Sequence, residues 1–255
     1  MKRPLLLDVK RLAVHDGPGI RTAFFVKGCP LRCRWCHNPE SQSPQPQIAR
    51  FRHLCRHCEK CTLDESTCPT RAFKRYGMPM SIPKIVGKAL EDKPFYDESG
   101  GGVTLSGGEP LLFPEWTEAV LRAFKEVGLH VCLDTSLFAE PSVIDSLLPL
   151  VDLWLPDFKA NDDMLHRRWT GVSNMPIKAN LSRLAAAGAK MEVRCLSVPG
   201  ISDGSDLVRR HRWLHSIGIP ESDIVDLDYH DMARSKYLAL GLPDRMPFPH
   251  GGRRT

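Results

Sequence analysis

Three cysteines, Cys29, Cys33 and Cys36, stand close together with three and then two residues between them. A structural zinc ion or a closed [4Fe-4S] cluster takes four protein ligands, whereas three ligands leave one metal position free to bind another molecule. The spacing therefore indicates a [4Fe-4S] cluster with one open iron. A zinc ion with a distant fourth ligand, such as His37, and ordinary reduced thiols are the alternatives that the residues leave open.

A second group of cysteines follows, in the pattern C-x2-C-x2-C and then C-P. This pattern resembles a bacterial ferredoxin motif, except that its last gap, of six residues, is longer than theirs. Because four thiolates complete a closed site, the sequence predicts an auxiliary iron–sulfur cluster, with zinc as the alternative. Its ligands would be Cys55, Cys58, Cys61 and Cys68.

The composition is that of a globular protein with reduced cysteines. The chain has 255 residues, enough for one substantial core, and a formal net charge of +5 without a clustered basic stripe, which gives little support to nucleic-acid binding. No apolar run is long enough to cross a membrane, and the first residues lose their apolar character too early for a secretory signal. We therefore expect a cytoplasmic protein that binds neither nucleic acid nor membrane. The isolated Cys132 and Cys195 should be buried and inert.

Strands and helices are expected to alternate along most of the chain, which predicts an α/β fold with a parallel sheet and right-handed crossovers. Apolar runs predict the strands, and apolar residues at helical spacing predict the helices. The expected strands are residues 21–26, 103–105, 130–133, 153–158, 191–196 and 224–227. The expected helices are residues 82–90, 114–127, 141–148, 177–187 and 206–214.

Polar or glycine-rich groups follow each expected strand. In parallel α/β folds ligands bind at the carboxyl ends of the strands, so these groups should converge on one site. Any one of them has an ordinary structural explanation, but all six strands end this way. After the cysteine motif, the groups in chain order are residues 106–110 (SGGEP), Asp134 with Thr135, Asp157 with Lys159, Arg194 with residues 199–200, and Tyr229 with His230.

The three-cysteine motif, with Trp35 before its last cysteine, resembles the signature of radical S-adenosylmethionine (SAM) enzymes. More narrowly, several stretches between about residues 8 and 241 resemble the glycyl radical enzyme activating enzymes, of which pyruvate formate-lyase activase is the best known. These stretches are residues 16–21 (DGPGIR), 35–38 (WCHN), 95–110 (FYDESGGGVTLSGGEP), 170–174 (TGVSN) and 229–230 (YH).

The resemblance implies a partial (β/α)6 barrel of radical SAM type, open on one side, with a small ferredoxin-like cysteine insert. Residues 49–77 would form the insert, and residues 1–48 and 78–255 the barrel. The first three cysteines would hold the [4Fe-4S] cluster, whose open iron binds SAM, and Gly107, Gly108 and Glu109 would receive the methionyl amino group. The residues expected around the rest of SAM, with a monovalent cation near its carboxylate, are Trp35, His37, Asp134, Thr135, Asp157, Lys159, Arg194 and His230.

The implied activity is that of an oxidoreductase that installs a glycyl radical on a partner enzyme. The SAM-derived 5′-deoxyadenosyl radical would take a hydrogen atom from a glycine Cα in a C-terminal loop of the partner, so no side-chain acid or base is needed for that step. A flavodoxin or ferredoxin would supply the electron. A radical SAM enzyme acting on a small molecule and a non-enzymatic electron carrier or zinc module are the alternatives.

The sequence departs from the family pattern at several points. It has one ferredoxin-type cysteine group where several larger members have two, Leu137 stands where glycine often follows the Asp-Thr pair, and Asp228 stands where proline commonly precedes Tyr-His. Pro156 falls inside an expected strand, where it cannot donate to a ladder, so we expect a bulge or a strand end there.

Overall fold

The computed structural model describes residues 3–246, and its centre is a five-stranded sheet in the order β1-β2-β5-β6-β7. β1 is antiparallel to β2, whereas β2, β5, β6 and β7 run parallel to one another. These strands are β1 (Leu5–Ala13), β2 (Arg21–Lys27), β5 (Gly102–Gly107), β6 (Val131–Thr135) and β7 (Leu153–Pro156). β7 ends at Pro156, as expected from the missing N–H of proline.

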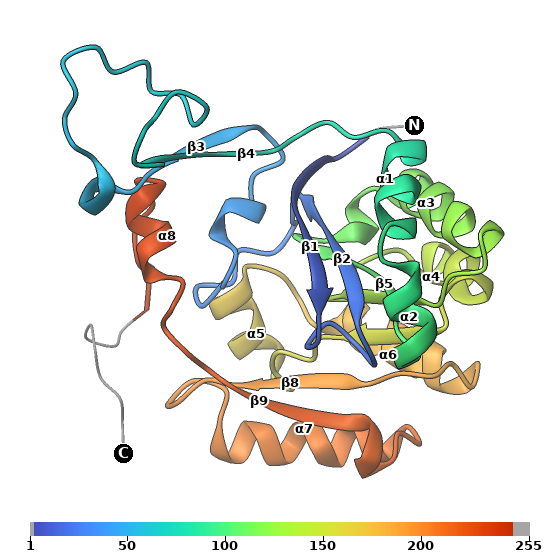
Figure 1. The fold of residues 1–255 in the computed structure, drawn as a ribbon. Helices are drawn as coiled ribbons and strands as arrows, with labels where there is room; N and C mark the ends of the chain where they lie inside the picture. The colour runs from blue at the N-terminus through green and yellow to red at the C-terminus, as the bar shows by residue number, and fades with distance from the viewer. Residues whose placement is uncertain (1–2, 247–255) are drawn as a thin grey trace.

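β8 (Val193–Ser197) and β9 (Ile224–Asp228) form a parallel pair that continues this sheet. Parallel bridges join Trp154 to Met191 and Asp157 to Arg194, so β8 lies beside β7. The parallel strands therefore follow the order β2-β5-β6-β7-β8-β9 (Figure 1). No pairing between β9 and β1 closes the barrel within residues 3–246. The fold is the predicted α/β partial barrel, open between these two edges.

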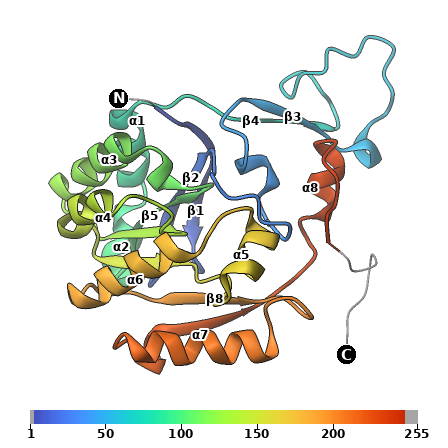
Figure 2. The same cartoon turned by 180° about the vertical axis from the view of Figure 1, so that it is seen from behind.

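Helices cover the outer face of the barrel, and the main apolar core lies between them and the sheet (Figures 1 and 2). Phe24, Leu105 and Leu133 from neighbouring strands pack in one cluster with Trp116 and Phe124 of α3. The helices are α1 (Ile82–Leu90), α2 (Lys93–Ser99), α3 (Pro114–Glu126), α4 (Pro141–Leu147), α5 (Asp163–Thr170), α6 (Met175–Ala186), α7 (Gly204–Ser216) and α8 (Arg234–Ala239). Short 3-10 helices are η1 (Pro39–Ser41), η2 (Arg52–Leu54), η3 (Pro110–Leu112), η4 (Leu148–Leu150) and η5 (Glu221–Asp223).

The cysteine-rich segment stands out from the barrel as an arm. β3 (Gln47–Arg50) pairs antiparallel with β4 (Phe73–Tyr76), and the chain between them projects away from the sheet (Figures 1 and 2). The division into an insert of residues 49–77 and a barrel of residues 1–48 and 78–255 stays a prediction, and residues 1–2 and 247–255 lie outside the described part. No helix among the described residues is long and apolar enough to cross a membrane.

Candidate functional site

A cavity of about 420 Å³ opens at the carboxyl ends of the parallel strands, and the three-cysteine loop forms one of its walls. This loop follows β2, and Cys29, Cys33 and Cys36 all line the cavity. Burial raises the pKa of the Cys33 thiol to about 12, because a thiolate there would lose its hydration. A metal centre would compensate this loss by binding the thiolates directly, so the wall of one buried and two partly buried cysteines fits a [4Fe-4S] cluster.

The structure brings most of the predicted site residues to this cavity. Asn38 and Ser136, which were not predicted, also line it, although each directly follows a predicted residue in the sequence. Glu109 and Arg194 are not among its lining residues. The predicted residues that do line it are Cys29, Cys33, Trp35, Cys36, His37, Gly107, Gly108, Asp134, Thr135, Asp157, Lys159 and His230.

Another part of the cavity wall carries paired charges. The Lys159 Nζ atom lies 2.7 Å from Asp157 Oδ2, and the Ser106 hydroxyl donates to Asp134 Oδ2 at 2.6 Å. Burial, reinforced by the charge of Asp157, raises the pKa of Asp134 to about 6. Burial alone would lower the pKa of Lys159, but the charges of Asp157 and Cys33 outweigh it and raise that pKa. The wall thus offers a fixed ammonium group and two carboxylates to a zwitterionic ligand.

Gly107 and Gly108 let two backbone segments meet at the cavity. The Gly108 amide donates to Val26 O at 2.8 Å, and the next amide, that of Glu109, donates to Gly28 O at 2.9 Å. These bonds continue the β2–β5 pairing into the start of the cysteine loop. A Cβ atom on Gly108 would lie 2.7 Å from the carbonyl carbon of Gly28, so only glycine allows this approach.

Glu109 is fully buried, and its carboxylate is used inside the protein. It accepts hydrogen bonds from the Thr135 hydroxyl at 2.6 Å, the Ser136 amide at 2.8 Å and the Leu111 amide at 3.0 Å, and also from the Ser136 hydroxyl. The carboxylate therefore holds the turn after β6. The next residue in that turn, Leu137, has φ of +59°, a backbone conformation that glycine adopts without strain.

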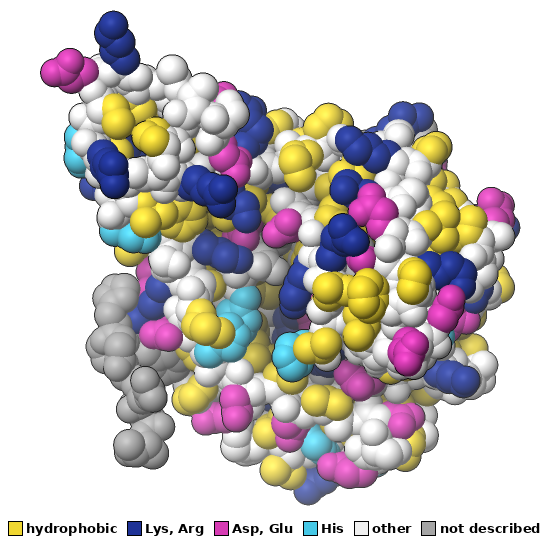
Figure 3. Space-filling model, in the orientation of Figure 1, with side chains coloured by type: hydrophobic (Ala, Val, Ile, Leu, Met, Phe, Trp, Pro, Cys, Tyr) yellow, Lys and Arg dark blue, Asp and Glu magenta, His cyan; other side chains and the backbone are white. Residues whose placement is uncertain are grey.

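A larger cavity of about 870 Å³ adjoins the first on the open side of the barrel, and His37, Asn38 and His230 line both. The rings of His37 and His230 stack with centroids 3.9 Å apart, and His37 Nε2 lies 3.1 Å from His230 O. Burial and the neighbouring His230 lower the pKa of His37 to about 4, so this ring is neutral near pH 7. Arg194 lines this larger cavity. Figure 3 shows histidine and basic side chains around a hollow on this face.

Comparison with known proteins gives the family. A sequence model of the radical SAM superfamily matches residues 24–214. The chain is 34% identical to the (2S)-3-sulfopropanediol dehydratase activating enzyme of Klebsiella oxytoca, over 98% of this chain and 90% of that protein. It is 35% identical to the benzylsuccinate synthase activating enzyme of Thauera aromatica, over 94% and 83% of the two chains. The chain is a radical SAM protein of the glycyl radical enzyme activating enzyme family.

A solved structure supports the fold of this activating enzyme. The crystal structure of Streptococcus suis SuiB bound to the precursor peptide SuiA aligns with a TM-score of 0.56 at 13% identity, over 83% of this chain and 39% of that one. The predicted function, activation of a glycyl radical enzyme by use of a [4Fe-4S] cluster and SAM, is confirmed by the family. The small-molecule and non-enzymatic alternatives are not favoured.

The C-terminal helix α8 holds the cysteine loop of the activating enzyme from outside. Lys236 Nζ donates to His37 O at 3.1 Å, to Asn38 Oδ1 at 2.9 Å and to Glu40 Oε1 at 2.7 Å. The Tyr237 hydroxyl donates to Cys36 O at 3.1 Å. A helix nearly two hundred residues away therefore fixes the backbone that follows the last cysteine of the motif. No local sequence pattern predicts this contact.

Substituting Lys236 by Met should destabilise the protein by about 2–3 kcal/mol, because the carboxylate of Glu40, only 3% exposed, would lose its cation. Chemical denaturation measures this loss. The matched double variant Lys236→Met/Glu40→Gln, which removes the buried charge as well, should regain about half of it. Equal loss in the single and double variants would contradict a charge-based explanation.

The second cysteine group lies in the arm between β3 and β4. Cys58 and Cys61 are exposed, whereas Cys55 and Cys68 are partly buried. The Arg50 guanidinium donates to Cys55 Sγ at 3.5 Å and lowers the pKa of that thiol, and the Ala72 amide donates to Cys68 Sγ at 3.3 Å. Both contacts favour thiolates, which metal binding requires.

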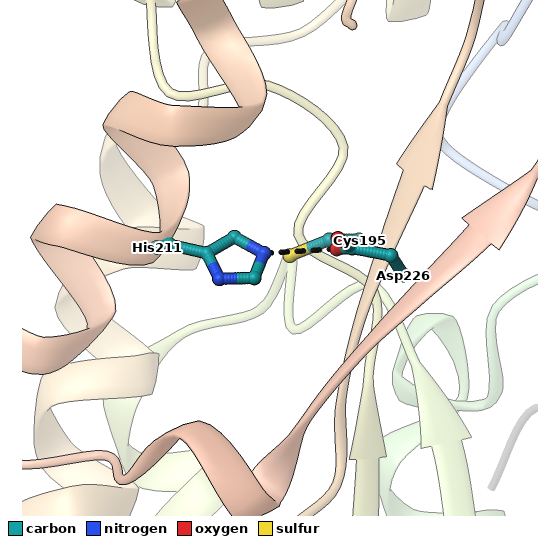
Figure 4. A group of neighbouring side chains, drawn as sticks. All are labelled: Cys195, His211 and Asp226. Carbon is teal, nitrogen blue, oxygen red and sulfur yellow. Dashed lines mark hydrogen bonds and ion pairs between the residues drawn. The ribbon is translucent and has the colours of Figure 1, made fainter. Parts of the chain in front are cut away.

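The two isolated cysteines are buried, as predicted. Cys195 of β8 lies near His211 of α7 and Asp226 of β9, and their possible ligand atoms are within 4.8 Å of one another (Figure 4). The positive charge of the neighbouring Arg210 acts on the buried Cys195 thiol and lowers its pKa, against the larger effect of burial, so a cation already lies near this sulfur and opposes a metal ion. The group is better explained as an ion pair between His211 and Asp226, whose Nε2 and Oδ1 atoms are 2.9 Å apart.

This ion pair predicts a pH-dependent contribution to stability. Burial alone would lower the pKa of His211, but hydrogen bonds to Asp226 and Glu221 outweigh it and raise the pKa above 6.5. A raised pKa stabilises the fold below the unfolded pKa of about 6.5, and the contribution disappears as pH rises through the folded pKa. His211→Gln should therefore cost about 1 kcal/mol at pH 5.5 and markedly less at pH 9, as measured by denaturation at both values. An equal cost at both pH values would contradict the ion pair.

Proposed function

We propose that the smaller cavity is where this activating enzyme binds SAM, with Cys29, Cys33 and Cys36 as the ligands of the open-site cluster. The observation that carries the proposal is the convergence of these three thiols with the groups at the strand ends on one cavity of about 420 Å³. When bound and reduced, the cluster supplies the electron that splits SAM and releases the 5′-deoxyadenosyl radical. The protein contributes positioning and exclusion of water.

The strand-end residues are proposed to orient SAM as follows. The backbone of Gly107 and Gly108 faces the methionyl amino group, and Lys159 faces the methionyl carboxylate. Asp134 and Asp157 are the natural ligands of a monovalent cation at that position, because both are carboxylates beside the same wall. Thr135, with Ser136, forms the part of the wall that Glu109 holds in place, so Glu109 acts through its neighbours. Trp35, His37 and His230 would contact the ribose and adenine, and Arg194 would reach them from the adjoining larger cavity, which it lines.

The partner's glycine-bearing loop is proposed to enter through the larger cavity. Its volume of about 870 Å³ and its position at the open side of the barrel suit an extended protein segment. The two cavities share His37, Asn38 and His230, so a loop seated in the larger one would reach the SAM cavity beside the stacked histidine rings. The relatives carry the names of activating enzymes for dehydratases, a synthase, lyases and a decarboxylase at 30–35% identity, and we propose no narrower class of partner.

The cysteine arm is proposed to hold an auxiliary [4Fe-4S] cluster, and a flavodoxin or ferredoxin is the proposed reductant. The support for the cluster is the C-x2-C-x2-C spacing, together with the contacts of Cys55 and Cys68 that favour thiolates. Double substitution Cys58→Ala/Cys61→Ala should remove about four irons per chain and no zinc. Loss of one zinc instead would identify a zinc site. These reduced thiols also support the proposed cytoplasmic location.

The proposed site is tested by formation of a glycyl radical in a partner glycyl radical enzyme, which is sought first among the products of the genes beside this protein's gene. Anaerobic incubation of both proteins with SAM and a reductant should give the doublet of a glycyl radical in the partner's electron paramagnetic resonance spectrum. The Cys33→Ala variant should give neither the doublet nor SAM cleavage. Undiminished SAM cleavage by that variant would contradict the proposed role of the cysteine loop.

A further inference from the structure

The outer side of the cysteine loop carries a cluster of arginines around one indole ring. The guanidinium carbon of Arg34 lies 5.0 Å from the ring centroid of Trp169, and that of Arg168 lies 5.8 Å from it. Arg32 is on the same loop as Arg34, and Trp169 and Arg168 belong to the last turn of α5. We call Arg32, Arg34, Arg168 and Trp169 the arginine patch. None of these residues lines either cavity.

Backbone hydrogen bonds fix the arginine patch in place. The Arg32 amide donates to Thr170 O at 2.6 Å, and the Arg34 amide donates to Trp169 O at 3.0 Å. The last carbonyls of α5 thus pair with the cysteine loop, and Gly171 ends the helix with φ of +84°. The patch is therefore a rigid surface attached directly to the cluster-binding loop.

A continuous aromatic path leads inward from the patch. The ring of Trp169 stacks on that of Trp35 with centroids 6.2 Å apart and planes 29° apart. Trp35 is 4% exposed, directly precedes Cys36, and packs with Cys33 in one apolar cluster. The distance from the protein surface to the cluster cysteines is thus bridged by two indoles.

The charges of the patch face solvent without acidic partners. Within residues 3–246 no carboxylate lies at ion-pair distance from Arg32, Arg34 or Arg168, whereas the neighbouring Arg167 is paired with Asp163. The Arg32 guanidinium donates to the backbone carbonyls of Cys29 and Leu31. Guanidinium groups without an acidic partner, two of them beside a partly buried indole, favour contact with carboxylates of another molecule. None of the patch residues lines the larger cavity at the open side of the barrel, so both surfaces could be used at the same time.

We propose that the arginine patch is the docking surface for the acidic one-electron carrier that reduces the cluster. In this step the reduced carrier loses one electron and the cluster gains it, while Trp169 and Trp35 shorten the gap without being oxidised. The inference rests on the proposed cluster at the three cysteines. The cysteine arm is the competing route, since Arg56 and Lys60 are also exposed there.

The test measures binding and reduction separately in the anaerobic holoenzyme, with a flavodoxin as the probe. Arg34→Glu/Arg168→Glu should raise the dissociation constant of the flavodoxin at least about tenfold and slow flavodoxin-driven bleaching of the cluster absorbance. Reduction by dithionite, which needs no docking, should keep its wild-type rate. For the unaltered enzyme, the affinity should fall steeply as ionic strength rises above about 0.1 M.

Two matched double variants carry the same charge change elsewhere. Lys84→Glu/Arg212→Glu, on exposed positions of α1 and α7, should bind flavodoxin as the unaltered enzyme does. Arg56→Glu/Lys60→Glu tests the cysteine arm, and weaker flavodoxin binding in this variant alone would overturn the proposal. Wild-type affinity in Arg34→Glu/Arg168→Glu would overturn it as well. If the patch variant folds poorly, the proposal is tested by the single variant Arg168→Glu and by the salt dependence of flavodoxin binding to the unaltered enzyme. Wild-type affinity in the single variant together with salt-independent binding would overturn the proposal. Failure of dithionite to bleach the unaltered enzyme would instead refute the cluster itself.

Discussion

Replacing Gly108 by Ala is expected to abolish SAM cleavage and to destabilise the protein by at least about 3 kcal/mol. The new Cβ would lie 2.7 Å from the carbonyl carbon of Gly28 and 2.9 Å from Ser41 O, and neither backbone atom can move without shifting the cysteine loop. The hydrogen bond from the Glu109 amide to Gly28 O would also be broken. Iron content per chain, SAM cleavage and the denaturation midpoint measure the three consequences.

Gly87→Ala is the matched control for this prediction. Gly87 lies within α1, its φ is not positive, and a Cβ there would meet nothing within 4 Å. Alanine in a helix interior is favoured over glycine by about 1 kcal/mol, so this variant should be slightly more stable and fully active. Gly108 lacks a positive φ as well, so backbone strain does not distinguish the two sites. A difference in stability or activity between the two variants would therefore arise from the close approach of the Gly108 and Gly28 backbones. Normal activity of Gly108→Ala would contradict that explanation.

The parallel part of the fold could be predicted because its strands and helices carry simple patterns. The apolar run of β2 and the amphipathic pattern of α3 are both visible in the sequence. In the structure these elements begin and end within a few residues of the expected bounds. The edge strand β1 was not predicted. It carries exposed charges, and its register with β2 shifts twice, so it has no regular alternation.

The short helices α2, α5 and α8 and the strands β3 and β4 were also missed. α8 has six residues and α5 has eight, too few for a helical period to be distinguished from a loop. Their positions depend on contacts with distant residues, such as Lys236 with Glu40 and the Trp169 carbonyl with Arg34. Contacts of this kind between segments far apart in the chain leave no local pattern.

The site could be predicted in part, because parallel strands bring their carboxyl ends together whatever their spacing in the sequence. That rule predicts that Asp134, Asp157 and Lys159 lie near the cysteine loop, and all three line one cavity with its cysteines. It gives no information about the direction of each side chain. Glu109 follows a strand end like the others, but its carboxylate points into the turn after β6, and Arg194 lines the larger cavity.

Glu109→Gln is expected to weaken SAM binding at least about tenfold while the iron content of the cysteine loop stays near that of the unaltered enzyme. The carboxylate accepts four hydrogen bonds, whereas an amide has an NH2 group in place of one oxygen. A hydroxyl can rotate to accept from that group, but at least one backbone N–H, of Ser136 or of Leu111, would be left unpaired. Each buried unpaired donor costs about 1–3 kcal/mol, which is enough to displace the turn that lines the SAM cavity.

Substitutions at Thr135 distinguish this indirect role of Glu109 from direct contact with SAM. Thr135→Val removes the hydroxyl that donates to Glu109 at 2.6 Å, whereas Thr135→Ser keeps it. If Glu109 acts through the turn, Thr135→Val should weaken SAM binding as Glu109→Gln does, and Thr135→Ser should bind nearly normally. Equilibrium binding of SAM to each variant, with and without its iron–sulfur cluster, measures these affinities. Normal SAM affinity in Thr135→Val, together with weak binding in Glu109→Gln, would show that the carboxylate touches SAM itself, because the turn would then be dispensable.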